Sequence, residues 1–311
     1  MRVAALDLGT NTFHLLIAEK GTRVKFLLKK TLVVKLGKEG FNNGFISSPA
    51  FARGLNALKI FSGYIKKFKP DKITALATSA IRGCRNGKDF IRRGEKILRS
   101  KIEIIPGEKE AELIYYGVKN SFAIDNKPVL IMDVGGGSIE FIIATDKEIL
   151  WKKSIEAGAA RLLEKFSPTN PITKDEQLAI EKYLSEKFSE VIKNIRKYKP
   201  QIMLGSSGSF DSLALMLAYK KNKPAGYSRQ TVFEIPLSDY FSLHLNLLSS
   251  TKKQRLKIKG LHRMRVDMIV LAGMCIYFIL KNSEIKKLYR SAYSLKEGIV
   301  FSEFEIKRGQ H

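Results

Sequence analysis

Two stretches of this sequence end an apolar run on an aspartate and follow it with a turn of small or polar residues. The first has Asp7 and then Gly9, Thr10, Asn11 and Thr12; the second has Asp133 and then Gly135, Gly136, Gly137 and Ser138. Glycine leaves no Cβ in the way, so such a turn can point several backbone N–H groups at one anion. Ordinary hairpins also favour Gly-Ser and Thr-Asn turns, but two copies favour a pair of phosphate-binding turns.

Carboxylates beside these turns can hold a hard divalent cation. The candidates are Asp7, Asp133 and Glu140. Mg²⁺ is usually bound by one or two carboxylates together with substrate phosphates, so we expect Mg²⁺ here, with Mn²⁺ as the alternative. Aspartates at strand ends also cap backbone amides, and the sequence leaves that structural role open for Asp7 and Asp133.

The repeated order of strand, aspartate, turn and returning strand predicts two related halves that face each other across a cleft. Each half is expected to open with a three-strand meander, at 4–8, 12–19 and 24–34 and again at 129–133, 139–144 and 148–154. Further strands are predicted at 73–77, 102–105, 202–204 and 287–290. Helices are predicted at 48–67, 89–98, 108–118, 173–198, 268–280 and 294–304, those at 173–198 and 268–280 being one long charged helix and one buried helix.

A chain of 311 residues is long enough for two domains. We expect domain I at 1–122 and domain II at 123–311, with the closing helix near 300–311 packing back on domain I. The sequence has no signal-peptide pattern, its apolar run at 268–280 is too short to span a bilayer, and Cys84 and Cys275 lack disulfide or zinc spacing. These features predict a soluble cytoplasmic protein.

The net charge of +25, from 55 Lys and Arg against 30 Asp and Glu, has two interpretations. A large positive surplus indicates polyanionic partners. General lysine usage on a solvated surface explains the same number. The charge alone therefore does not choose between a substrate-directed and a compositional origin.

Two further motifs narrow the interpretation. Residues 77–82 read Ala-Thr-Ser-Ala-Ile-Arg, and residues 105–115 read Ile-Pro-Gly-Glu-Lys-Glu-Ala-Glu-Leu-Ile-Tyr. With the duplicated turns, they resemble the exopolyphosphatase and guanosine pentaphosphate phosphohydrolase family of the actin-like phosphotransfer superfamily, in a short two-domain form and over nearly the whole chain. The resemblance implies an α/β protein with two actin-like (ribonuclease H-like) domains, each a mixed sheet flanked by helices, and a cleft between them.

In the family, a glutamate is the general base that activates water. Alignment through Gly107 and Ala111 selects Glu110 for this role, although Glu108 and Glu112 are close neighbours. Without the resemblance, a glutamate-rich helix start has an ordinary explanation, because carboxylates favour that position. Lys109 stands where the family has a second glutamate, and we expect its charge to lower the pKa of the base.

The resemblance and the turn chemistry together predict the phosphate-binding residues. Besides the two turns, they are Ser79, Arg82, Arg161, Gly205, Ser206, Ser207 and Gly208. A guanidinium at position 82 can clamp a phosphate through two hydrogen bonds, and a surface salt bridge is its alternative. The turn at 205–208 suits either a phosphate or a nucleotide base. The segments 265–267 and 291–298 also match family patterns, for which we expect a structural role.

The predicted function is that of an exopolyphosphatase, a phosphoanhydride hydrolase that releases orthophosphate from the end of inorganic polyphosphate by metal-assisted attack of a Glu-activated water. The alternative within the same chemistry is hydrolysis of guanosine pentaphosphate. Two other classes stay open, an ATP-dependent kinase and a non-catalytic polyanion-binding protein.

The expected partners are these phosphate substrates and, as an open alternative, a second copy in a homodimer; a membrane is not expected and nucleic acid is disfavoured. Without further C-terminal domains, short or medium polyphosphate chains are expected to be preferred.

Overall fold

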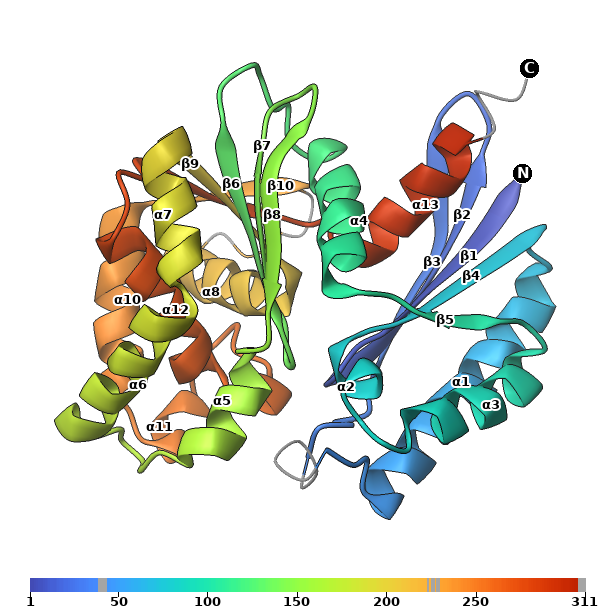
Figure 1. Ribbon diagram of the computed structural model, residues 1–311, viewed down its shortest axis with the longest axis horizontal. Coiled ribbons are helices and arrows are strands. Elements are labelled where there is room, and N and C mark those ends of the chain that lie inside the picture. The colour runs from blue at the N-terminus through green and yellow to red at the C-terminus, as the bar shows by residue number, and fades with distance from the viewer. Residues whose placement is uncertain (39–43, 223, 225–226, 228–229, 307–311) are drawn as a thin grey trace. The chain divides into compact units, whose positions relative to one another are not determined.

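The computed structural model describes residues 1–38, 44–222, 224, 227 and 230–306, and the chain divides into two compact units (Figure 1). Unit 1 comprises Met1–Gly117 and Ser294–His311, and unit 2 comprises Val118–Tyr293. The sequence predicts the first boundary after residue 122, but the chain leaves unit 1 earlier, inside a helix that continues to Lys119. The closing helix belongs to unit 1; residues 307–311 of that prediction lie outside the described part of the chain.

Unit 1 contains a five-stranded mixed sheet in the order β3-β2-β1-β4-β5. Its strands are β1 (Arg2–Leu8), β2 (Thr12–Lys20), β3 (Val24–Val33), β4 (Lys72–Ala77) and β5 (Ile102–Ile104). The first three form an antiparallel meander, whereas β4 and β5 run parallel to β1. Short apolar runs separated by turn residues therefore predicted these strands to within one or two residues.

Helices cover both faces of this sheet. They are α1 (Ser48–Phe68), α2 (Ser79–Arg82), α3 (Gly87–Leu98), α4 (Gly107–Lys119) and α13 (Leu295–Ile306). Consecutive strand residues point to opposite faces. Thr74 of β4 donates a hydrogen bond to Glu303 of α13 (2.7 Å), while Ile102, level with the next residue of β4, lies against Gly94 of α3. Accordingly α13 lies on one face, and α3, with α1 packed beside it, lies on the other.

Unit 2 repeats the plan of unit 1 and extends it by one strand. The strand order is β10-β11-β9-β6-β7-β8. Its strands are β6 (Val129–Val134), β7 (Ile139–Ala144), β8 (Ile149–Ile155), β9 (Ile202–Ser206), β10 (Val232–Ile235) and β11 (Lys287–Ser291). Antiparallel β6, β7 and β8 correspond to β1, β2 and β3, and the parallel strands β9 and β11 correspond to β4 and β5. The predicted fold class, two related α/β halves with mixed sheets, is confirmed.

The helices of unit 2 differ from prediction in two ways: the helices at 237–249 and 252–255 were not predicted, and one predicted long helix is broken. They are α5 (Ala159–Phe166), α6 (Lys174–Lys187), α7 (Ser189–Tyr198), α8 (Ser207–Lys220), α10 (Leu237–Ser249), α11 (Lys252–Arg255) and α12 (Ile269–Lys281). The prediction of a single long helix at 173–198 is wrong, because the helix breaks at Phe188 (φ −100°, ψ 9°). The fully buried Phe188 ring packs edge-on against Phe141 and Phe278, at centroid distances of 5.1 and 5.9 Å. Tertiary packing thus interrupts a helix in which the sequence has no Gly or Pro.

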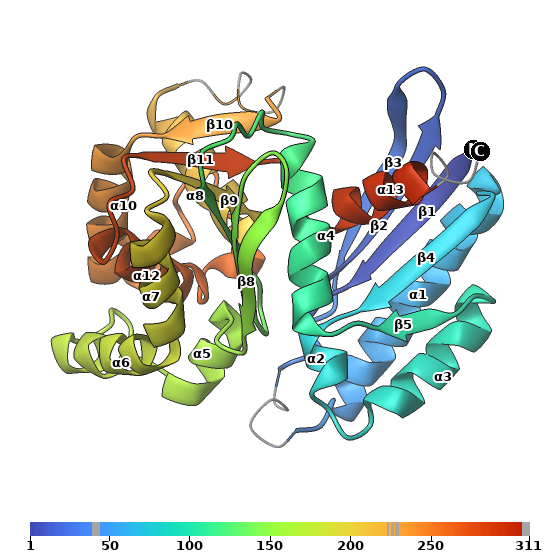
Figure 2. The same ribbon diagram turned by 45° about the horizontal axis from the view of Figure 1, so that its top comes forward.

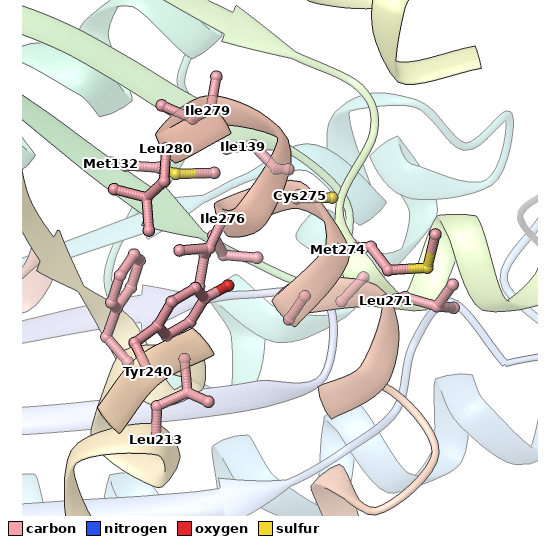
Figure 3. Packing of buried hydrophobic residues seen from close by; sticks show 14 of the residues in the cluster. Met132, Ile139, Leu213, Tyr240, Leu271, Met274, Cys275, Ile276, Ile279 and Leu280 are labelled. Carbon is pink, nitrogen blue, oxygen red and sulfur yellow. The ribbon is translucent and has the colours of Figure 1, made fainter. Parts of the chain in front are cut away.

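The buried helix α12 organises the core of unit 2 (Figure 3). Ile276 and Ile279 of α12 are fully buried, and Tyr240 of α10 donates a hydrogen bond to the Gly273 carbonyl (2.8 Å). Each buried Ile or Leu side chain contributes about 1.5–3 kcal/mol relative to exposure, so α12 ties the neighbouring helices to the sheet. Within the described residues, neither α12 nor another helix is long and apolar enough to cross a membrane.

Candidate active site

The predicted site residues of unit 1 come from the ends of three neighbouring strands. The parallel strands β1, β4 and β5 have their C-terminal ends at the same edge of the sheet. At that edge the turn at 9–11 follows β1, α2 follows β4, and α4 follows β5. Ligands of open α/β sheets bind outside the carboxyl ends of strands. The fold therefore brings the first turn, Ser79, Arg82 and Glu110 to one edge.

The turn after β1 has its carbonyl groups occupied by the protein. The Thr10 carbonyl accepts a hydrogen bond from Leu36 N (2.7 Å), and the Asn11 carbonyl accepts from Val34 N and Lys35 N (2.9 and 3.0 Å). A Cβ at Gly9 would lie 2.9 Å from the Thr12 carbonyl oxygen, so this tight turn requires glycine. With its carbonyls bound on one side, the turn can present N–H groups on the other.

The side chains next to this turn form a short polar chain. Thr12 Oγ1 lies 2.9 Å from His14 Nε2, and His14 Nδ1 lies 2.9 Å from Thr31 Oγ1. Asp7 is level with His14 in the β1–β2 ladder. The Thr12 hydroxyl, predicted to bind phosphate, thus has an imidazole partner within unit 1.

Glu110 lies in the first turn of α4 and is only 7% exposed. Its Oε2 accepts a hydrogen bond from Arg82 Nη1 at 3.3 Å, and the same nitrogen donates to the Ile105 carbonyl at 2.9 Å. The salt-bridge alternative for Arg82 is thus present, but its partner is the predicted base. One cation therefore contacts the carboxylate of the predicted base and holds it beside the strand ends.

The two neighbouring glutamates are placed differently. Glu108 is exposed, and Glu112 accepts a hydrogen bond from Lys109 Nζ at 2.8 Å. Of the three glutamates that the sequence could not rank without the family, only Glu110 is buried. Lys109, predicted to act on the base, has its ammonium group on Glu112.

The turn between β6 and β7 in unit 2 is backed by the start of α5. The carbonyls of Gly135, Gly136 and Gly137 accept hydrogen bonds of 2.9–3.1 Å from the N–H groups of residues 158–161. A Cβ at Gly158 would lie 2.5 Å from the Gly136 carbonyl oxygen, which explains the glycine at that position. In the part of the chain that the structure describes, the N–H groups of Gly136, Gly137 and Ser138 donate no hydrogen bond. Three donors can therefore point at an anion.

Asp133 and Glu140 are directly opposite each other in the β6–β7 ladder and are 6% and 1% exposed. Asp133 Oδ2 accepts a hydrogen bond from Ser206 Oγ at 2.6 Å, and Glu140 Oε1 accepts from Ser154 Oγ at 2.7 Å. These serines orient two buried carboxylates next to the glycine turn.

Serine side chains of the turn after β9 donate hydrogen bonds to the end of β6. Ser206 binds Asp133, while Ser207 and Ser209 both donate to the Val134 carbonyl at 3.1 Å. A Cβ at Gly205 would lie 2.0 Å from the Phe210 ring, so this glycine makes room for the core. The hydroxyls predicted to bind phosphate here thus have protein acceptors, and they position Asp133 and its strand end.

Arg161, another predicted phosphate ligand, is also bound to the glycine turn. Its Nε donates to the Gly137 carbonyl at 3.0 Å, and its Nη2 contacts the Glu156 carboxylate. The guanidinium therefore supports the turn from behind.

One residue missing from the predicted site is Arg265. A Cβ at Gly208 would lie 1.6 Å from its Nη2, which places its guanidinium directly against the turn after β9. Loss of hydration lowers the pKa of Arg265, while the negative charges of Asp211 and Asp133 raise it. The sequence shows a family-like segment at 265–267, but nothing in it indicates that the chain returns to Asp133 there.

The carboxylates of unit 2 fit a hard cation that takes most of its ligands from substrate and water. Within the described ranges, no group of three or more His, Cys, Asp or Glu side chains comes together. Mg²⁺ commonly uses one or two carboxylates plus phosphate oxygens, and the paired Asp133 and Glu140 supply that number. Soft or tetrahedral metal sites need more nitrogen or sulfur ligands than are present here.

The comparisons with known proteins identify the family. The model of the Ppx/GppA phosphatase family matches residues 16–306. The chain belongs to this family. A putative exopolyphosphatase of Haemophilus influenzae is 27% identical over 301 residues, which cover 96% of this chain and 90% of that protein.

Two solved structures extend the agreement to the fold of the family. An exopolyphosphatase from Cytophaga hutchinsonii is 36% identical, covers 98% of both chains and superposes with a TM-score of 0.95. The family member from Aquifex aeolicus is 23% identical, covers 100% of this chain and 99% of its own, and has a TM-score of 0.82. The resemblance that the sequence motifs indicate is therefore confirmed over nearly the whole chain.

Proposed function

We propose that this protein is a Mg²⁺-dependent exopolyphosphatase that releases orthophosphate from the end of inorganic polyphosphate. The observation that carries the proposal is the buried Glu110–Arg82 pair at the strand edge of unit 1. Unit 2 adds a glycine turn with three N–H donors beside two carboxylates. The 36% identity to a structure described as an exopolyphosphatase supports the same substrate.

Each unit supplies one part of the reaction. Glu110 accepts a proton from water, whose oxygen attacks the terminal phosphorus as the bond to the bridging oxygen breaks; the shortened chain takes the negative charge on that oxygen. Arg82 holds the Glu110 carboxylate in place and carries positive charge to the transferring group. In unit 2 the N–H groups of Gly136, Gly137 and Ser138 bind phosphate oxygens. Mg²⁺ held by Asp133 and Glu140 would neutralise charge on the phosphates.

Guanosine pentaphosphate is the second candidate substrate, because the family that the sequence motifs resemble includes phosphohydrolases of that nucleotide. The same hydrolysis would then remove one terminal phosphate from a nucleotide.

A phosphate-release assay tests the proposal. Purified protein is compared on short polyphosphate, long polyphosphate, guanosine pentaphosphate and ATP, with and without Mg²⁺. We expect Mg²⁺-dependent release of orthophosphate from polyphosphate at a kcat/KM well above that for the two nucleotides. Preference for guanosine pentaphosphate would select the second candidate, and ATP turnover that needs an acceptor would indicate a kinase.

A further inference from the structure

The solvent face of α3 is strongly basic. Eight of the twenty residues 82–101 are Lys or Arg, against 55 of 311 in the whole chain. Four of the exposed ones lie on one side of the helix and define what we call the basic face of α3: Lys88, Arg92, Lys96 and Arg99. At 3.6 residues per turn they fall within an arc of about 80°. The buried residues of the helix, which include Phe90 and Leu98, lie opposite.

These charges are poorly compensated. Arg92 Nη2 contacts Asp89 at 2.6 Å in an exposed pair, which is worth little in water. Among the residues that the structure describes, Lys88, Lys96 and Arg99 form no ion pair. Like charges spaced four residues apart destabilise a helix. The pattern therefore costs stability unless an anion lies along the face.

The basic face of α3 begins next to the predicted site. A Cβ at Gly87 would lie 2.2 Å from the Ile81 carbonyl oxygen, so the first turn of α3 packs directly on α2. Arg82, which contacts the predicted base Glu110, closes α2, and the exposed Arg85 lies in the short connection between the two helices (Figure 2). From there α3 continues for 12 residues, a length of about 18 Å.

We propose that the basic face of α3 binds the tail of a linear polyphosphate whose terminal phosphate lies at the site. The inference rests on the proposed function and deepens it, because it names the part of the protein that holds the remainder of the chain. A linear polyanion with a charge on every repeat matches cations that recur about once per helical turn. Affinity is expected to rise with chain length until the chain covers α3, and then to level off.

Single-stranded RNA also carries a repeated charge, but its binding sites add aromatic side chains on which bases stack. The aromatic residue of α3, Phe90, is fully buried and packs against Phe51 and Phe13. The exposed face has only charged side chains. An inorganic chain without bases therefore fits it better.

The test removes the four charges and compares the result with a matched control. The test variant is K88Q/R92Q/K96Q/R99Q, and the control variant is K182Q/K193Q/R196Q/K199Q. The control removes four exposed cations from α6, α7 and the cap of α7. Both sets end on a C-cap residue with positive φ, 54° at Arg99 and 48° at Lys199. Glutamine keeps the helix propensity of Lys and Arg. Circular dichroism melts check folding, and the pair K88Q/K96Q replaces the test variant if that variant does not fold.

Binding of long polyphosphate is measured in EDTA, so that turnover is not needed. We expect Kd to rise about 16-fold in the test variant, roughly twofold for each of the four exposed charges, and to depend less steeply on salt. The control should change by less than twofold. With Mg²⁺ present, KM for long chains should rise in the test variant while KM for tripolyphosphate stays within twofold.

Four outcomes would overturn the inference: no binding of long polyphosphate by the unmodified protein, an equal change in test and control, an unchanged Kd, or an equal rise in KM for tripolyphosphate. If the test variant loses binding to single-stranded RNA and keeps polyphosphate, the face serves RNA instead. Failure of the proposed function would look different, as an absence of phosphate release from every polyphosphate, whatever the Kd in EDTA.

Discussion

The turns after β1 and β6 have the same backbone design and different surroundings. In both, a Cβ at the first glycine would lie 2.9 Å from the carbonyl oxygen three residues later, Thr12 in unit 1 and Ser138 in unit 2. In both, the turn carbonyls accept hydrogen bonds from backbone N–H groups of a later segment. Duplication has therefore preserved the device that turns N–H groups toward an anion.

The side chains beside the two turns separate their chemistry. Asp7 is level with an imidazole, that of His14, whereas Asp133 is level with a second carboxylate, that of Glu140. Unit 1 has instead a buried carboxylate on a different element, that of Glu110, with Arg82 as its partner. We propose that this difference reflects a division of labour, in which unit 2 would hold cation and phosphate and unit 1 would supply the base.

The largest expected effect comes from the base of unit 1. Glu110→Gln keeps the shape of the side chain but cannot accept a proton, so kcat for phosphate release should fall by about 10²–10⁴-fold while substrate binding persists. Glu108→Gln is the matched control, because that carboxylate is exposed on the same helix. Steady-state kinetics and equilibrium binding check both. Unchanged turnover in Glu110→Gln would remove the base from unit 1.

The second largest effect is expected where the start of α5 packs against the glycine turn of unit 2. In Gly158→Ala the new Cβ meets the Gly136 backbone at 2.5 Å, so the turn has to shift. Displacements near 1 Å can cost on the order of 100-fold in rate, and we expect a loss of that order in kcat/KM. Gly63→Ala is the control, since no atom lies within 4 Å of its Cβ; it should keep activity and gain about 0.5–1 kcal/mol of stability. Full activity in Gly158→Ala would show that the α5 contact is dispensable.

A smaller effect is expected from the serine that orients Asp133. Ser206→Ala removes the 2.6 Å hydrogen bond to the carboxylate, and loss of such outer partners typically costs 10–100-fold in metal affinity. The Mg²⁺ concentration for half-maximal activity should therefore rise about tenfold. Ser209→Ala removes a hydrogen bond to the Val134 carbonyl instead and should leave the metal dependence unchanged. Equal shifts in both variants would mean that general loosening, and not metal binding, is being measured.

The smallest effect on activity is expected at His244, a buried residue of unit 2 whose titration affects stability. Its Nδ1 has no hydrogen-bond partner among the described residues, and burial lowers its pKa from 6.5 to about 4. Between pH 6.5 and 4 the imidazole is therefore protonated in the unfolded chain and neutral in the folded chain. The free energy of unfolding falls as the pH drops through this range, by about 3 kcal/mol in total. His244→Phe should flatten this dependence in urea unfolding at pH 5 and 7. A pH dependence as steep as that of the unmodified protein would assign it to other groups.

The sequence predicts the strands and turns whose structure depends on neighbouring residues in the chain. Continuous apolar runs that end on an aspartate mark β1 and β6, and the glycine after each aspartate marks the turns. The break at Phe188 was not predictable, because it follows from rings contributed by Phe141 and Phe278 far along the chain. Arg265 was missed for the same reason, since its position against Gly208 depends on how β9, α8 and the following segments pack.

The most direct test of the division of labour is the Mg²⁺ dependence of phosphate release in Glu140→Gln and Glu110→Gln. The account predicts that Glu140→Gln raises the half-saturating Mg²⁺ concentration at least about tenfold, whereas Glu110→Gln lowers kcat and leaves that concentration where it is. A shifted Mg²⁺ dependence in Glu110→Gln together with an unshifted one in Glu140→Gln would contradict it.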